Sequence, residues 1–183
     1  MATLIVLRYL PRALVLLGAV ALGVGTARAA APQEVQVKAA YMFHFVQFSG
    51  WPPEAFTSPD EPFVVGVLGD DPFGQHLDEA VAGEELNGHP MIVRRFQRVE
   101  DIDRCHLLYI AGNETRRLGQ IMPALVGRPI LTVGETEGFW RAAGMIRFVT
   151  VQNRVRFHIN HTAAKHAQLS LSAKLLRAAE HVE

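Results

Sequence analysis

The chain has 183 residues, 49% of them hydrophobic, and its 18 basic residues balance its 18 acidic ones. Residues 1–29 hold three of the basic residues and none of the acidic ones, so the remainder carries a net charge of −3. Because phosphate binding depends on clustered lysines and arginines, this charge argues against nucleic acid as a partner.

The N-terminal segment has the three-part layout of a secretory signal peptide. Arg8 and Arg12 form a short basic region, and residues 13–27 carry no charge. Ala27-Arg28-Ala29 then places small residues where a signal peptidase cleaves. We therefore expect a signal peptide over residues 1–29 and, from the length of the rest, a single exported domain over residues 30–183. An uncleaved N-terminal anchor is the alternative.

The first elements after this segment are predicted to be a helix, a strand and a second helix. Residues 35–48 place apolar side chains at helical spacing, and residues 63–68 form the short, Val-rich run of a buried strand. Asp71 suits the N-cap and Pro72 the first turn of the second helix, which we expect to end near Val81.

Strands and helices continue to alternate in the middle of the chain. We expect strands at 91–96, 105–110 and 130–133, a helix at 114–126 capped by Asn113, and a helix at 135–143. This order predicts an α/β fold with a mostly parallel sheet and helices on both faces, a Rossmann-like, three-layer architecture.

The C-terminal part is predicted to be a hairpin followed by a helical tail. Residues 145–151 and 155–160 are expected to be strands joined by a three-residue turn at 152–154. This hairpin would add antiparallel strands at one edge of the sheet. Residues 162–181 are expected to be helical, with a break near Gln168.

No catalytic set is visible in the sequence. The segment after the first strand, Gly66 to Asp71, lacks a glycine-rich phosphate loop, and there is no G-x-S-x-G motif. Asp70 and Asp71 lie where open α/β sheets place ligands. This pair would either bind a metal or share a proton, or simply cap the helix and shape the turn.

Histidines and the single cysteine give no clear metal or redox site. His158, His161 and His166 are close in sequence, but a metal site needs three or four converging ligands, so we expect none. Cys105 lies beside the apolar stretch 106–110 and is expected to be a buried, inert, unpaired thiol.

The residues predicted to contact a partner come from three places. Trp51 lies in a Pro-rich loop, and aromatic residues favour both interfaces and cores. Arg154 and Arg156 occupy alternate positions of one strand and therefore share a face. The complete predicted set is Trp51, Asp70, Asp71, Arg147, Arg154 and Arg156.

Six segments carry a family resemblance, in order and over nearly the whole exported chain. They are Val37 to Tyr41 with the stretch from Phe45 to Pro52, Leu68 to Gly74, Cys105 to Ile110, Gly144 to Val149, Arg154 to Asn160, and Leu171 to Arg177. Together they resemble the YfiR family of periplasmic proteins.

The resemblance implies a regulatory function without a cofactor. YfiR acts in the periplasm of Gram-negative bacteria, where it binds the periplasmic domain of an inner-membrane diguanylate cyclase and inhibits that enzyme. An outer-membrane lipoprotein sequesters YfiR and so releases the cyclase. The output is cytoplasmic cyclic di-GMP, which controls biofilm formation and motility. The family fold is α/β, and its members tend to form homodimers.

The chain departs from the family in its cysteines. Well-known members join a cysteine of the first strand to the one before His-Leu-Leu-Tyr. Cys105 keeps the second position, whereas the first, at or near Gly66, has no cysteine. The second family disulfide is absent too, so redox control through these bonds is not expected.

Two other functions compete with the regulatory one. A periplasmic small-molecule sensor would bind a ligand in the crevice at the carboxyl edge of the sheet and act on a membrane signalling protein such as a sensor kinase. A hydrolase or metalloprotein would need Asp70, Asp71, His158 and His161 to lie close together.

Overall fold

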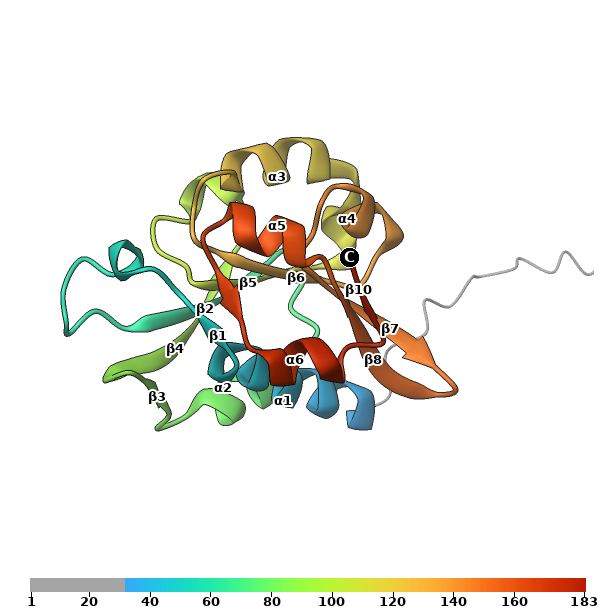
Figure 1. Ribbon diagram of the computed structural model, residues 1–183, viewed down its shortest axis with the longest axis horizontal. Coiled ribbons are helices and arrows are strands. Elements are labelled where there is room, and N and C mark those ends of the chain that lie inside the picture. The colour runs from blue at the N-terminus through green and yellow to red at the C-terminus, as the bar shows by residue number, and fades with distance from the viewer. Residues whose placement is uncertain (1–31) are drawn as a thin grey trace, which may run out of the picture.

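The computed structural model describes residues 32–183, so the expected signal peptide at 1–29 lies outside the described part (Figure 1). Within it, the central sheet has eight strands. In spatial order they are β10 (His181–Val182), β8 (Arg154–Ile159), β7 (Ile146–Val151), β6 (Leu131–Gly134), β5 (Leu107–Ile110), β2 (Phe63–Leu68), β4 (His89–Phe96) and β3 (Glu85–Leu86).

The sheet is mostly parallel, as predicted. From β4 across β2, β5 and β6 to β7, each adjacent pair of strands is parallel, whereas the short edge strand β3 is antiparallel to β4. Strand β8 is antiparallel to β7, which confirms the hairpin and places it one strand in from the edge of the sheet. The outermost strand beside it is β10, which pairs parallel to β8.

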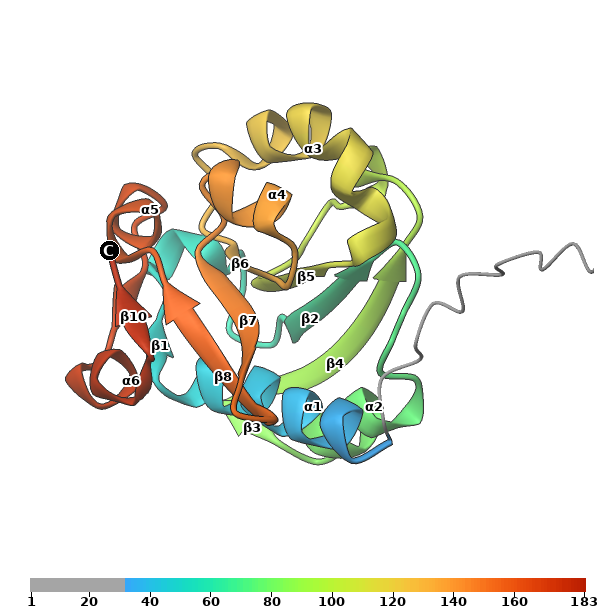
Figure 2. The ribbon, with the colours of Figure 1, turned by 90° about the vertical axis from the view of Figure 1, so that its right-hand side faces the viewer.

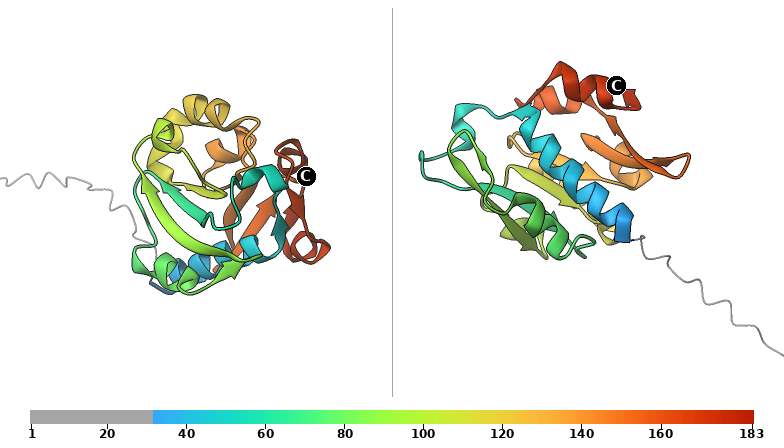
Figure 3. Two further views of the ribbon diagram at one scale, coloured as in Figure 1. Left: turned by 90° about the vertical axis from the view of Figure 1, so that its left-hand side faces the viewer. Right: turned by 90° about the horizontal axis from the view of Figure 1, so that it is seen from below.

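Helices cover both faces of this sheet and complete three layers (Figure 2). On one face α1 runs across the strands with α2 beside it (Figure 3). On the other face lie α3 and α4. The bounds are α1 (Pro32–Gln47), α2 (Gln75–Val81), α3 (Leu118–Leu125) and α4 (Glu137–Arg141).

Each face of the sheet has its own hydrophobic core. Val65 and Val67 of β2 belong to the core that also contains α1 and α2 residues, whereas Val64 and Leu68 belong to the core beneath α3. Every residue of β2 is buried. Its continuous apolar run is therefore that of a central strand with helices on both sides.

The C-terminal tail differs from the predicted helix. It begins with α5 (His161–His166) and breaks at Gln168, whose φ of 59° confirms the expected interruption. The elements β9 (Ser170–Leu171), α6 (Ala173–Ala178) and β10 follow. Strand β9 pairs with β1 (Ser49–Gly50), so tertiary pairing overrides the local helical pattern.

Neither of the two predicted N-cap residues, Asp71 and Asn113, caps a helix. The helix after Asp71 begins only at Gln75, and the Asp71 carboxylate accepts the Phe73 N–H at 2.7 Å. The segment after Asn113 is first a 3₁₀ helix, η3 (Gly112–Arg117), and α3 follows it. Asn113 Oδ1 accepts the Asp70 N–H instead, which joins two loops at the carboxyl edge.

Two further boundaries are corrected by the structure. The hairpin turn has two residues rather than three, Gln152 and Asn153, with φ values of 49° and 61°. Such paired positive φ angles match the right-handed twist of hairpin strands. The helix expected at 135–143 is shorter, because Thr136 caps it by accepting the Phe139 N–H.

Candidate functional site

One face of the β7–β8 hairpin is only partly covered by helices, and the hairpin tip projects beyond them (Figure 1). The strand register pairs Phe148 with Phe157. Both rings pack against Phe45 of α1, whose ring centre lies 5.0 Å from that of Phe157. The opposite face carries the charged residues. We call it the hairpin face and define it by Arg147, Arg154, Arg156, His158, His181 and Trp140.

The three arginines predicted as contact residues share this face. Arg154 is exposed at the end of the hairpin, and the Arg156 side chain is 41% exposed, with Nε 4.0 Å from Glu180. Arg147 is deeper, with a side chain 18% exposed, and it donates to Glu137 of α4. Arg154 and Arg156 therefore share a face, as their alternation predicted, and the register adds Arg147 to it. Their contact with a partner stays a prediction.

Two histidines and a tryptophan complete the hairpin face. His158 lies opposite Arg147 on one side and opposite His181 on the other. The His158 ring is 5.5 Å from the His181 ring and 5.9 Å from that of Trp140. Burial lowers the pKa of His158 below its ordinary value, and the positive charge of Arg147 lowers it further.

The predicted acidic contact residues lie elsewhere in the molecule. Asp70 and Asp71 follow β2, and strands β5 and β6 separate them from the hairpin. Asp71 binds Arg95 at 2.7 Å in addition to the Phe73 N–H, so it orders its own loop. Asp70 is exposed. The structure therefore does not bring these aspartates and the arginines together into one site.

Trp51 is half-buried and anchored inside the molecule. Its indole N–H donates to the carbonyl oxygen of His106 at 3.0 Å, and its ring meets Phe63 edge-on at 4.8 Å. These contacts fix the loop after α1 against β2 and β5. A role in contacting a partner stays a prediction, restricted to the part of the ring that remains exposed.

The carboxyl edge between β2 and β5, where the sequence placed a ligand crevice, is filled by the protein's own side chains. A Cβ atom on Gly69 would meet Asn113 Oδ1 at 2.6 Å and Glu114 Cγ at 2.8 Å. Glu114 is buried and paired with Arg117 at 3.0 Å.

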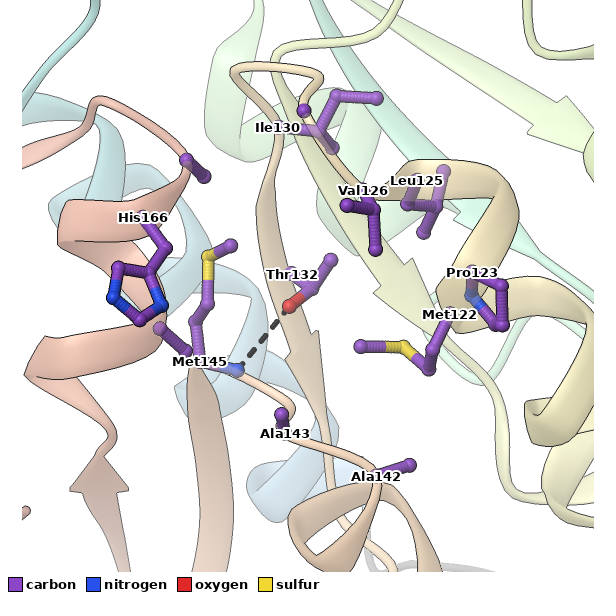
Figure 4. A pocket seen from close by; sticks show the side chains of 13 residues that line it. Met122, Pro123, Leu125, Val126, Ile130, Thr132, Ala142, Ala143, Met145 and His166 are labelled. Atoms are coloured by element: carbon purple, nitrogen blue, oxygen red, sulfur yellow. Dashed lines mark hydrogen bonds between the residues drawn. The ribbon is translucent and has the colours of Figure 1, made fainter.

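An apolar cleft of about 410 Å³ opens at the other end of the strands. It lies between α3, the turn after α4, and α5 (Figure 4). Met122 and Val126 form one wall, Met145 and His166 another, and Thr132 the floor, where its hydroxyl accepts the Met145 N–H at 3.2 Å.

The predicted metal and redox candidates do not form a site, although His166 is also part of the cleft wall. Among residues 32–183, no three histidine, cysteine or acidic side chains are grouped closely enough to hold a metal ion. Cys105 is a free, buried thiol that donates to the Leu107 carbonyl at 3.1 Å. Burial raises the pKa of this thiol to about 12, so it is inert as a nucleophile.

Comparison with known families assigns the chain, because residues 35–180 match the YfiR/HmsC-like family. The chain belongs to this family. The resemblance of the six sequence segments is thereby confirmed over nearly all of residues 32–183. No helix of this YfiR/HmsC-like chain, within those residues, is apolar and long enough to span a bilayer.

Solved structures similar to this YfiR/HmsC-like chain support its fold alone. The ABC domain from Streptococcus pneumoniae in complex with L-Trp has a TM-score of 0.54 at 10% identity, over 79% of this chain and 60% of that one. A conserved domain protein from Vibrio cholerae O1 biovar eltor has a TM-score of 0.51 at 8% identity, over 81% and 60%. The chain thus spans about 60% of either structure. The comparison with curated proteins found no match.

Proposed function

We propose that the protein is a periplasmic regulator that inhibits a membrane-bound diguanylate cyclase by binding its periplasmic domain through the hairpin face. Family membership supports a role in cyclic di-GMP regulation. The observation that carries the contact site is the open hairpin face, where Arg147, Arg154 and Arg156 line up on one side of two strands. Exposed arginines are among the residues that dominate protein interfaces.

Inhibition by contact requires a difference in affinity between two states of the cyclase. A regulator that binds the inactive state more tightly shifts the equilibrium by typically ~1–3 kcal/mol, which is a roughly 5–150-fold change. The hairpin face provides the binding energy and needs no catalytic group. An outer-membrane lipoprotein that sequesters the protein, and a homodimer, are further proposals that rest on the family resemblance.

The test measures cyclic di-GMP in the host bacterium. Deleting the gene should raise cyclic di-GMP, and the secreted wild-type protein should lower it again. Arg154→Glu with Arg156→Glu should fail to lower it although the variant accumulates in the periplasm. Arg98→Glu is the matched control, because Arg98 is 64% exposed and precedes η2 (Val99–Asp101), away from the hairpin.

Two results would overturn the proposal. An unchanged cyclic di-GMP level after deletion would show that the protein does not regulate this messenger. If the Arg154→Glu, Arg156→Glu variant instead lowers cyclic di-GMP as fully as the wild type, the hairpin face is not the contact surface. Crosslinking in membranes, with recovery of a cyclase by the wild type and not by this variant, would identify the partner directly.

A further inference from the structure

The charge of the hairpin face depends on pH more than that of a surface built from arginines alone. The three arginines face two carboxylates, Glu137, which Arg141 of α4 also contacts at 3.4 Å, and Glu180. His158 and His181 add no charge while neutral, but each adds one positive charge when protonated. Acidification therefore makes a face that is already cationic more strongly so.

The two histidines lie in one row of cationic groups across three strands. Arg147 on β7, His158 on β8 and His181 on β10 are direct neighbours in the strand register. Arg156, two residues before His158, lies on the same face. Without a ligand, burial holds the pKa of His158 below its ordinary value, and the positive charges of Arg147 and of a protonated His181 lower it further.

The other groups packed around His158 weaken this effect but do not cancel it. Glu137 on α4 and Glu180 before β10 favour the protonated ring, whereas burial, Arg147 and His181 oppose it more strongly. Trp140 covers one edge of the ring and carries no charge. A carboxylate bound beside the row would supply the missing negative charge.

We propose that the hairpin face binds an acidic, extended segment of its protein partner, and that protonation of His158 and His181 tightens this binding as the periplasm acidifies. The location of the contact rests on the proposed function. The occupant follows from charge and spacing. Arg154 and Arg156 are about 7 Å apart along the strand, which is also the spacing of every second side chain in an extended segment. Guanidinium groups bind carboxylates through two parallel hydrogen bonds.

Binding and protonation are linked, so each strengthens the other. A bound carboxylate raises the pKa of a neighbouring histidine, and each unit of that rise is a tenfold gain in affinity once the pH lies below both pKa values. Glutamate side chains stay ionised down to about pH 5, because their ordinary pKa is about 4.3. If a bound carboxylate raises the pKa of His158 by one unit, the affinity is about tenfold higher in acid than at pH 7.5.

The test uses a blocked synthetic peptide of alternating glutamate and threonine, titrated into the exported protein by calorimetry at pH 7.5 and pH 5.5. The peptide with glutamine in place of glutamate is the matched control. The wild-type protein should bind the acidic peptide about tenfold more tightly at pH 5.5. His158→Gln with His181→Gln should lose the increase, so that its affinity is the same at pH 7.5 and at pH 5.5. Arg154→Gln with Arg156→Gln should bind weakly at either pH.

Each remaining outcome counts against a defined part of the proposal. Equal binding of the glutamate and glutamine peptides would overturn the acidic occupant. A pH-independent affinity, or a pH dependence that survives in the histidine double variant, would overturn the coupling. Circular dichroism at pH 5.5 shows whether each variant is folded. The cyclic di-GMP assay with the arginine variants decides the proposed function separately, since it does not depend on the peptide.

Discussion

His106 connects three parts of the chain through a neutral imidazole ring. Its Nδ1 accepts the Val64 N–H at 3.0 Å, and its Nε2 donates to the Ala55 carbonyl at 3.1 Å. The ring also stacks on Phe63 at 4.7 Å. Burial lowers the pKa of His106, and a proton on Nδ1 would displace the Val64 N–H.

The stability that His106 contributes should therefore decrease in acid. Its pKa in the folded state lies below the unfolded value of about 6.5, so its contribution is complete above that pH and is lost as the pH falls below it. His106→Phe should cost about 1–3 kcal/mol at pH 7.5, because the Val64 N–H loses its acceptor. The cost should be smaller at pH 5.5. Urea denaturation at both pH values measures this difference, and an equal cost at both would refute the assignment.

Gly66 and Cys105 lie side by side where other family members are expected to have a disulfide. A Cβ atom on Gly66 would lie 2.7 Å from Cys105 Sγ. It would also lie 2.9 Å from Leu108 Cδ1, so a new side chain requires a small shift of that leucine. The position that the family resemblance indicated, at or near Gly66, therefore lies beside the single cysteine of the sequence.

Gly66→Cys should restore the missing disulfide. A disulfide that closes the loop between residues 66 and 105 stabilises a protein by at most about 4 kcal/mol. Crowding at Leu108 reduces this gain, so the oxidised variant should be about 2 kcal/mol more stable to unfolding than its reduced form. Thiol alkylation after denaturation shows whether the bond forms. Gly66→Cys with Cys105→Ser is the control and should respond to no reductant. Two free thiols in the oxidised variant would show that the two positions are not suitably oriented.

At the scale of whole elements, the sequence located strands better than helix ends. The apolar run at 63–68 coincides with β2, because burial on both faces leaves no polar residue within it. The helix start at Asp71 was wrong because the Asp71 carboxylate binds the Phe73 N–H in a turn that precedes the helix, which begins only at Gln75. The start at Asn113 was wrong because its side chain binds the Asp70 N–H in another loop. Long-range pairing is not encoded in a local pattern. For the same reason, β10 was assigned to a helix.

The candidate site shows the same division between local and long-range information. The alternation of Arg154 and Arg156 is a local property of a strand, and it predicted their shared face. Trp140 and His181 were missed as members, because α4 and β10 bring them to the hairpin face from other parts of the chain. A surface assembled from four elements could be identified only in part from sequence spacing.

For the molecule as a whole, stability should be distributed unevenly across the sheet. The strands β2 and β5 are buried on both faces and lie between two hydrophobic cores. Both residues of the edge strand β10 are exposed, and only two residue pairs join this strand to β8. Local opening requires little free energy where few apolar contacts are lost. The edge that carries His181 is therefore the part of the hairpin face that opens most readily.

Hydrogen exchange should reveal this gradient. The amides of Leu108 and Tyr109 in β5 should exchange only through global unfolding, whereas the Glu183 amide, which donates to the Ile159 carbonyl at 2.8 Å, should exchange through local opening. Denaturant should accelerate the first group strongly and the second hardly at all. If Glu183 responds to denaturant as β5 does, then β10 belongs to the global unit, and His181 stays in the hairpin face as long as the protein is folded. If it opens locally, an acidic partner that contacts His181 should slow its exchange, because binding would hold the strand in place.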